Sequence, residues 1–401
     1  MDNKESIYLK VLEQLNETFN PENFDEEHLT NEMFNTEDVK TLQQPNFTYR
    51  RYLYRGNRLY VKLPLTWEKG KYPVVGNKIL AWGFSLTSVI SWTEPNRGFN
   101  ALENWKTSMR LKGINPDEYA SERADFGSVM HYLFSVYLKG TEFVKKTFKE
   151  DIVKALVKDG VLRETRAKYI LDNYNRNLWN ALIGFGRFVI DYNVRPIASE
   201  LIVQDSKNWI ATPVDLLCYM DVPVKIKVEV PTGEIYQRGE KKGESKTKEK
   251  TYVVPKSLIG IVDFKSGSKG FYNSHYFQLN WGKDMLEETY GIKAEILLNY
   301  APKDDMSTSY KVKEQMGSDN LDMFLPVMKE MSNLHLQDMF KDGIKLSYDD
   351  SGDSDTINIK NFKKKEDEEV NYVINGDEVI DNEFNYKFNY KNELNGTEKE
   401  D

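Results

Sequence analysis

An acid and a lysine stand two residues apart at the end of an apolar stretch, where residues 260–265 read GIVDFK. The stretch predicts a buried strand, and side chains two residues apart on a strand point to the same face. The carboxylate of Asp263 and the ammonium of Lys265 can therefore hold a divalent cation and a water side by side. The same spacing is typical of an ordinary ion pair, so the pair alone leaves both interpretations open.

Three further residues offer ligands of the types that a hard cation takes. Asp215 lies on a second predicted strand, and His131 follows Gly127 early in a predicted helix, where the glycine allows close packing. With Asp263 they form a set of one nitrogen and two oxygen ligands that suits Mg2+ or Mn2+. Glu200, at the start of the strand before Asp215, is either a further or second-metal ligand or a plain acid at a strand edge.

Arginines alternate with tyrosines in a predicted hairpin at residues 47–75. Arg51, Arg55 and Tyr54 belong to this mixture, which can contact phosphates and stack single-stranded bases. A solvated hairpin with tyrosines in the core has the same pattern, so this interpretation stays open as well. His275 lies at the start of a predicted helix over 274–290, where it is a candidate phosphate contact.

The elements that must position these residues follow from the spacing of apolar side chains. Helical spacing covers residues 99–112, 121–139, 143–158, 163–192, 274–290 and 320–341, and β-rich runs cover 201–203, 209–220, 258–264 and 293–300. Two alternating strands at 223–256 surround a tip rich in Lys, Glu and Gly, which predicts a long β-hairpin insertion. We expect an α+β or α/β fold with a mixed central sheet flanked by helices and an N-terminal helical part.

Charge divides the chain into unlike parts. Residues 1–45 carry 3 basic and 11 acidic side chains, residues 46–300 carry 39 and 28, and residues 350–401 carry 7 and 15. The formal net charge of -8 is thus an average over a basic body and two acidic ends, and it does not exclude a polyanionic partner. We expect an acidic extension over 1–45, a domain over 46–345, and a disordered tail over 346–401 that recruits a protein partner or mimics DNA.

A single cysteine, Cys218, excludes a disulfide framework, a four-cysteine zinc site and a four-cysteine iron–sulfur cluster. The charged first ten residues lack the apolar region of a secretory signal, and no apolar run is long enough to span a membrane. We therefore expect no membrane partner and a reducing compartment such as the cytoplasm. Enrichment in Asn, Lys, Tyr and Asp suggests an A+T-rich genome, such as that of a phage in a bacterial host.

The order of the candidate residues resembles the PD-(D/E)XK nuclease superfamily, in its RecB-like exonuclease branch. That branch has Gly-x-x-x-His on a helix, an acid on a strand, Asp-x-Lys on a later strand and Gln-x-x-Tyr on the following helix. The matching residues here are Gly127, His131, Asp215, Asp263, Lys265 and Gln278. Trp281 stands where the branch has Tyr, which bears on strand contacts at that helix, and Thr212 stands where Gly is common.

The resemblance continues toward the N-terminus. Residues 85–90, which read SLTSVI, and residues 102–106, which read LENWK, are similar to stretches of the mitochondrial genome-maintenance exonuclease and related phage exonucleases. The resemblance, over roughly residues 80–300, implies a restriction-endonuclease-like fold in which 223–256 is an insertion. It also implies that Ser85, Thr87 and Trp281 contact DNA.

The activity implied by the resemblance is that of a Mg2+- or Mn2+-dependent deoxyribonuclease, an exonuclease on single-stranded DNA or DNA ends in replication, recombination or repair. The implied catalytic residues are Asp263, Lys265, Asp215 and Gln278, and the implied metal ligands are His131, Asp215, Asp263, the main-chain carbonyl of Phe264 and, if it is a ligand, Glu200. Lys265 would orient the water or stabilise the phosphate, and Gln278 would position the water or the DNA backbone. Two alternatives stay open: a non-catalytic nucleic-acid-binding or virion protein on a nuclease fold, and a structure-specific endonuclease.

Overall fold

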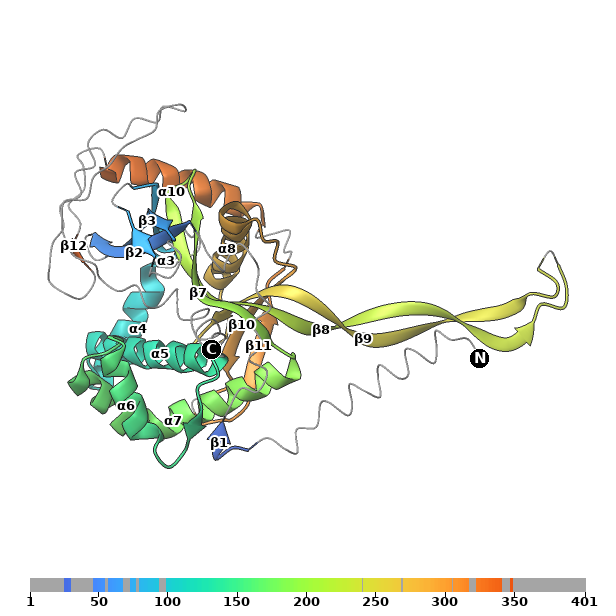
Figure 1. The fold of residues 1–401 in the computed structure, drawn as a ribbon, viewed down its shortest axis with the longest axis horizontal. Coiled ribbons are helices and arrows are strands. Elements are labelled where there is room, and N and C mark those ends of the chain that lie inside the picture. The colour runs from blue at the N-terminus through green and yellow to red at the C-terminus, as the bar shows by residue number, and fades with distance from the viewer. Residues whose placement is uncertain are drawn as a thin grey trace, which may run out of the picture.

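A ten-stranded mixed sheet forms the centre of the molecule, and helices cover both of its faces (Figure 1). The computed structural model describes residues 25–29, 46–54, 57–67, 73–76, 79–93, 99–239, 241–267, 270–304, 306–316, 322–340 and 347–348. Within these residues the strand order is β11-β10-β9-β8-β5-β3-β2-β12, with β4 beside β3 and β7 beside β8. The expected mixed central sheet flanked by helices is confirmed.

Most elements lie where the apolar periodicity predicts them. The strands of the sheet are β2 (Phe47–Tyr54), β3 (Asn57–Thr66), β4 (Val74–Val75), β5 (Ala81–Ser85), β7 (Arg195–Asp205), β8 (Ile210–Ile235), β9 (Ser245–Phe264), β10 (Ile296–Pro302), β11 (Tyr310–Glu314) and β12 (Ser347–Tyr348), and a separate pair is β1 (His28–Leu29) with β6 (Phe143–Val144). The helices are α3 (Leu86–Thr93), α4 (Phe99–Leu111), α5 (Pro116–Leu138), α6 (Phe148–Lys158), α7 (Glu164–Asp191), α8 (Asn273–Tyr290) and α10 (Phe324–Phe340).

One helix begins earlier than its periodicity indicates. The side chain of Asn115 caps α5 by accepting from the N–H of Asp117, and Pro116 takes the first helical position, where its missing N–H costs nothing. The expectation that Gly127 and His131 lie near the start of this helix was therefore wrong, because both lie well inside it.

Neighbouring residues of the central strands face opposite helix layers. Leu217 of β8 and Ile261 of β9 pack in the core that includes α3, α8 and α10. Leu216 and Val262, one residue away on the same strands, pack in the core that includes α5, α6 and α7. This alternation buries both faces of the sheet centre, so the ends of β8 and β9 are held firmly where the candidate acids lie.

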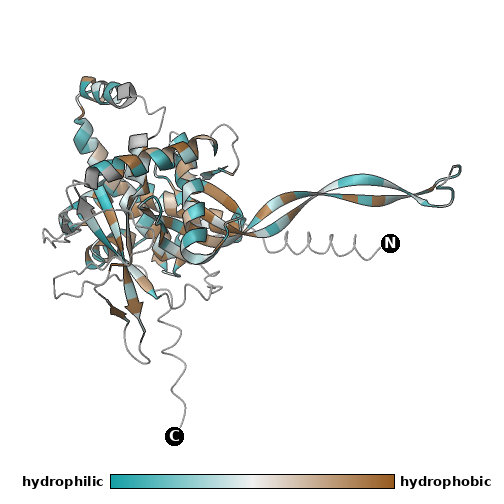
Figure 2. Cartoon of the chain, turned by 90° about the horizontal axis from the view of Figure 1, so that it is seen from above, coloured by the Kyte–Doolittle hydropathy of each residue, from teal (hydrophilic) through white to brown (hydrophobic). Residues whose placement is uncertain are grey.

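Strands β8 and β9 leave the body together as a two-stranded arm (Figure 1). Their antiparallel pairing runs from Leu216 opposite Val262 to Pro231 opposite Thr247 without a shift in register. Figure 2 shows that hydrophobic and hydrophilic residues alternate along this arm. The predicted insertion at 223–256 is therefore the outer part of the same two strands that carry the candidate acids.

Both acidic ends have a part that contacts the domain. Glu26 forms an ion pair with Arg187 of α7, and its carbonyl accepts a hydrogen bond from the indole of Trp179 (3.2 Å). At the other end β12, which falls within the predicted tail, pairs with β2. The rest of the predicted tail, and most of the predicted N-terminal extension, lie outside the described residues. None of the helices described here has the length and apolar character needed to cross a membrane.

Candidate metal centre

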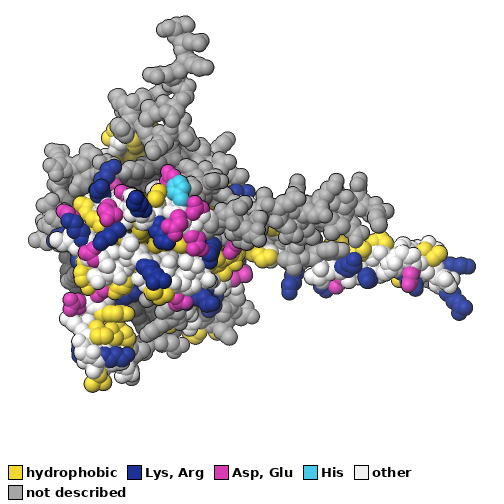
Figure 3. Space-filling view, turned by 90° about the horizontal axis from the view of Figure 1, so that it is seen from below, with side chains coloured by type: hydrophobic (Ala, Val, Ile, Leu, Met, Phe, Trp, Pro, Cys, Tyr) yellow, Lys and Arg dark blue, Asp and Glu magenta, His cyan; other side chains and the backbone are white. Residues whose placement is uncertain are grey.

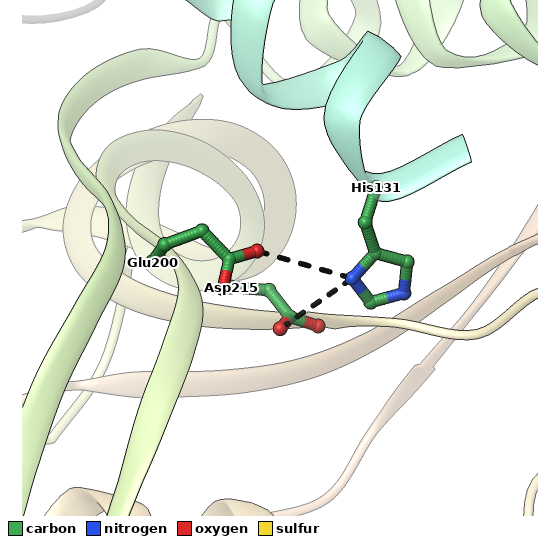
Figure 4. A group of neighbouring side chains, drawn as sticks. All are labelled: His131, Glu200 and Asp215. Atoms are coloured by element: carbon green, nitrogen blue, oxygen red, sulfur yellow. Dashed lines mark ion pairs between the residues drawn. The ribbon is translucent and has the colours of Figure 1, made fainter. Parts of the chain in front are cut away.

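Three side chains from α5, β7 and β8 face one another (Figure 4). The Nδ1 atom of His131 lies 3.7 Å from Oδ1 of Asp215 and 4.0 Å from Oε1 of Glu200. One possible ligand atom from each of the three lies within 4.8 Å of the others. We call His131, Glu200 and Asp215 the ligand group. It contains Glu200 where the sequence favoured Asp263.

Strand pairing brings the two carboxylates of the ligand group together. β7 pairs with β8 so that the residues on either side of Glu200 lie opposite the residues on either side of Asp215. Glu200 lies well inside β7, which begins at Arg195, so its expected place at a strand start was wrong. Its φ of 55° is in the left-handed region, which costs a non-glycine residue about 1 kcal/mol or more. Such strain is typical of positions that function requires.

Close approach of α5 to the chain after β9 positions His131. A Cβ atom added at Gly127 would lie 3.2 Å from Oγ of Ser266, a tight contact that the serine side chain would have to relieve by moving. Arg123, one turn earlier, donates to the carbonyl of Ser266 (3.3 Å). The ring of His131 then packs edge-on against Phe264, with 5.6 Å between the ring centres. The predicted role of Gly127 in close packing is confirmed.

Asp263, Lys265 and Gln278 form a second cluster, the lysine group. The Nζ atom of Lys265 donates to Oδ1 of Asp263 (2.8 Å) and to Oε1 of Gln278 (3.0 Å). This confirms that Asp263 and Lys265 share a face of the strand. Asn299 of β10 donates to Oδ2 of Asp263 (2.6 Å), and Gln315 donates in turn to Asn299 (2.7 Å). Sequence reasoning missed Asn299, although a lone amide in the apolar run of residues 296–300 was a signal.

The main chain of Phe264 joins the two groups. Its N–H donates to Oδ2 of Asp215 (2.6 Å), while the other oxygen of that carboxylate faces His131. A hydrogen bond between the Phe264 backbone and His131 also acts on the pKa of the ring, raising it against the effect of burial. The predicted participation of the Phe264 carbonyl as a ligand stays a prediction, but the backbone lies at the site.

Burial disfavours the charged acids of the site. It raises the pKa of Glu200 and of Asp215, and the negative charge of Asp215 raises the pKa of Glu200 further. Burial also raises the pKa of Asp263 to about 6, although the ammonium of Lys265 acts in the opposite direction. Burial and the charge of Lys265 lower the pKa of His131 to about 4. The ring is therefore neutral at pH 7 and has a lone pair to offer.

Basic side chains surround the ligand group. The positive charges of Lys139, Arg51 and Arg58 lower the pKa of Glu200 against the effect of burial, so all three act at the site. Arg51 was among the predicted DNA contacts, and its side chain is exposed on β2. The remaining two predicted contacts of this hairpin are not placed, because Arg55 and the side chain of Tyr54 lie outside the description.

The other predicted DNA contacts lie in different surroundings. Trp281 is fully buried and donates its indole N–H to Asp205 (3.0 Å), which corrects the expectation that it contacts DNA. The Nδ1 atom of His275 accepts the backbone N–H of the N-cap residue of α8 (3.2 Å), so the ring closes the helix end. Ser85 is buried at the end of β5, and Thr87 is exposed in the first turn of α3.

The ligand atoms of the ligand group are close enough together to converge on one divalent cation. Octahedral Mg2+ holds oxygen ligands at about 2.1 Å, which places adjacent ligand atoms about 3.0 Å apart and opposite ones about 4.2 Å apart. The distances of 3.7 and 4.0 Å lie between these two values, so the side chains would shift by a few tenths of an ångström to coordinate the ion. A cation would also offset the cost of burying the carboxylates. The nitrogen ligand favours Mn2+ over Mg2+.

Comparisons with protein-family models and with curated proteins find no match to this chain. Its function is therefore inferred from the residues of the site and their geometry.

Proposed function

We propose that this chain is a Mg2+- or Mn2+-dependent deoxyribonuclease. The observation that carries the proposal is the meeting of the ligand group and the lysine group across the backbone of Phe264. The first group offers the donor atoms that a cation needs. The second holds an ammonium beside them, where a phosphate would bind. The motif order that resembles the RecB-like nucleases supports the same assignment.

The ligand group would hold the cation, which when bound supplies a water of lowered pKa and stabilises negative charge on the phosphate. Asp215 has one oxygen fixed by the N–H of Phe264, so its other oxygen stays directed into the group. His131 contributes a neutral nitrogen, since its pKa lies well below 7. Asp263 lies close enough to Asp215 and His131 for the charged forms of these two residues to act on its pKa.

Lys265 supplies the fixed positive charge of the site. Its ammonium is held between Asp263 and Gln278, and 21% of its side chain is exposed, so a phosphate oxygen can reach it. A charge that is already in place stabilises the transition state without further reorganisation. Gln278 thus acts by positioning Lys265.

The charge near the ligand group supports a polyanionic substrate. Arg51, Arg58 and Lys139 place three cations around the ligand group, as a polyanionic backbone requires. We assign single-stranded DNA or DNA ends as the substrate, with exonucleolytic cleavage in replication, recombination or repair, in the cytoplasm. Thr87, exposed beside the sheet, is retained as a DNA contact.

The test is a time course on end-labelled DNA, single- and double-stranded, linear and circular, with Mg2+, Mn2+ or EDTA. We expect digestion of linear DNA in either metal, none in EDTA, and a loss of about 100-fold or more for Asp215→Asn, which removes a ligand charge. The control is Asp284→Asn, which removes a surface partner of Lys329. Cleavage of circles would show an endonuclease. Mn2+ binding without any cleavage would favour the non-catalytic alternative.

A further inference from the structure

The arm formed by β8 and β9 carries a surplus of basic side chains. Over residues 222–256 the sequence has nine Lys and Arg residues against five Glu. The acids are partly engaged within the arm, since Glu249 pairs with Lys227 and Glu234 pairs with Lys246. Figure 3 shows Lys and Arg side chains gathered at the far end of the arm.

The cations of the tip are available for a ligand. Arg238, Lys241 and Lys242 are exposed, and no ion pair to another described residue is found for any of them. Further down the arm, register places Lys248 and Lys250 on one face and Lys225 on the other, and all three are exposed. Basic groups thus occur on both sides of the ribbon as well as at its end.

The length of the arm sets its reach. Ile235 lies 20 residues beyond Asp215 on the same strand, β8. At about 3.3 Å per residue the arm ends about 65 Å from the ligand group, or about 19 base pairs of duplex at about 3.4 Å each. A two-stranded ribbon is also narrow enough to enter the major groove, where a phosphate chain runs along each side.

We propose that this arm binds the phosphate backbone of duplex DNA about 19 base pairs from the cleavage site, with Arg238, Lys241 and Lys242 as its outermost contacts. The distance is counted from the active site and so rests on the proposed function. The binding itself does not, because the tip is far from the ligand group. The arm gives affinity for a duplex that continues beyond the end being processed.

The test measures the affinity of the full chain for fluorescein-labelled duplexes of roughly 12 and 30 base pairs in EDTA, which stops metal-dependent cleavage. The variant is Arg238→Ala, Lys241→Ala and Lys242→Ala together. We expect the two proteins to bind the short duplex within about twofold of each other, and the variant to bind the long duplex at least about tenfold more weakly. The slope of log K against log salt on the long duplex should fall by about 2.7, or 0.9 for each of three contacts.

The matched control changes three exposed lysines at α6, on the other side of the body from the arm: Lys146→Ala, Lys154→Ala and Lys158→Ala. It should bind both duplexes like the wild type. Equal binding of the long duplex by the tip variant, or an equal loss on both lengths, would overturn the proposal. The same loss on a single strand of 30 nucleotides would overturn the assignment to duplex. If the chain shows the length effect in EDTA but cleaves no DNA in Mg2+ or Mn2+, the proposed nuclease activity is wrong. The proposed binding of duplex DNA by the arm is then unaffected.

Discussion

The buried carboxylates of the site lower the stability of the metal-free protein when they are ionised. Burial raises the pKa of Asp263 from an ordinary value near 3.8 to about 6. A group whose pKa is raised on folding stabilises the protein below its ordinary pKa, and that contribution is lost as the pH rises through the folded pKa. Two pKa units correspond to about 3 kcal/mol, so Asp263 lowers the free energy of unfolding by up to that amount as the pH rises from 4 to 7.

Asp263→Asn should therefore gain stability relative to the wild type as the pH rises. We expect the difference in free energy of unfolding, variant minus wild type, to shift in favour of the variant by up to about 3 kcal/mol between pH 4 and pH 7. Urea unfolding in EDTA measures it, and taking the difference cancels the pH dependence of groups that do not interact with Asp263. Saturating Mn2+ should abolish the shift. A difference that is flat with pH in EDTA would show that Asp263 is not held with a raised pKa.

At this scale some side chains were predictable and others were not. The shared face of Asp263 and Lys265 follows from the period of a strand, and the structure confirms it. The support from Asn299 depends on which strand lies beside β9, which no local pattern contains. Trp281 was misjudged because its place in a motif does not say which side of α8 faces the core.

At the scale of the elements, β5 and β8 approach so closely at Gly83 that there is no room for one added side-chain atom. A Cβ atom at Gly83 would lie 2.5 Å from the carbonyl carbon of Ile210, in the neighbouring backbone. The N–H of Phe84 donates to the carbonyl of Trp209 (2.8 Å), so moving the two strands apart would break this hydrogen bond. It would also displace α3, which follows β5 directly. The contact lies at the start of β8, five residues before Asp215.

Gly83→Ala should lower the stability by about 3 kcal/mol or more, since backbone atoms cannot rotate out of the way. The matched change is Gly282→Ala in α8, where a Cβ atom would meet nothing within 4 Å. That change should stabilise the helix by up to about 1 kcal/mol. Thermal unfolding should show shifts of opposite sign. A tolerated Gly83→Ala would show that β5 and β8 do not approach this closely.

Element types were easier to predict than element ends. The apolar period predicted α7 to within a few residues, because a long amphipathic helix repeats its signal many times. The start of α5 was missed because a cap at Asn115 decides it. The left-handed turn at Glu200 inside β7 was also missed, since no residue-type signal marks it.

The whole molecule is a basic body between acidic ends. Residues 350–401 carry 15 acidic and 7 basic side chains, and the body carries the cations that surround the ligand group. We expect an acidic segment on the same chain to compete with DNA for those cations, since the tether gives it a high effective concentration. The formal net charge of the chain therefore understates the affinity of the body for a polyanion.

Truncation after residue 349 should raise the affinity for DNA severalfold at low salt, and the difference should shrink as salt screens the charges. Fluorescence anisotropy on one duplex at several salt concentrations measures this change. The control is a full-length chain in which the acids of 350–401 are replaced by their amides, which should behave like the truncation. Unchanged affinity at low salt would show that the tail does not act on the DNA-binding surface.

The central claim is that Lys265 and the ligand group together hydrolyse DNA, and cleavage by one variant tests it most directly. Lys265→Met, which keeps the ligand group, should digest labelled linear DNA in Mn2+ about 100-fold or more slowly than the wild type while Mn2+ still raises its melting temperature. Lys329→Met, which removes a surface ion pair, should digest at the wild-type rate. Digestion by Lys265→Met at the wild-type rate, or no metal-dependent digestion by the wild type, would contradict the account.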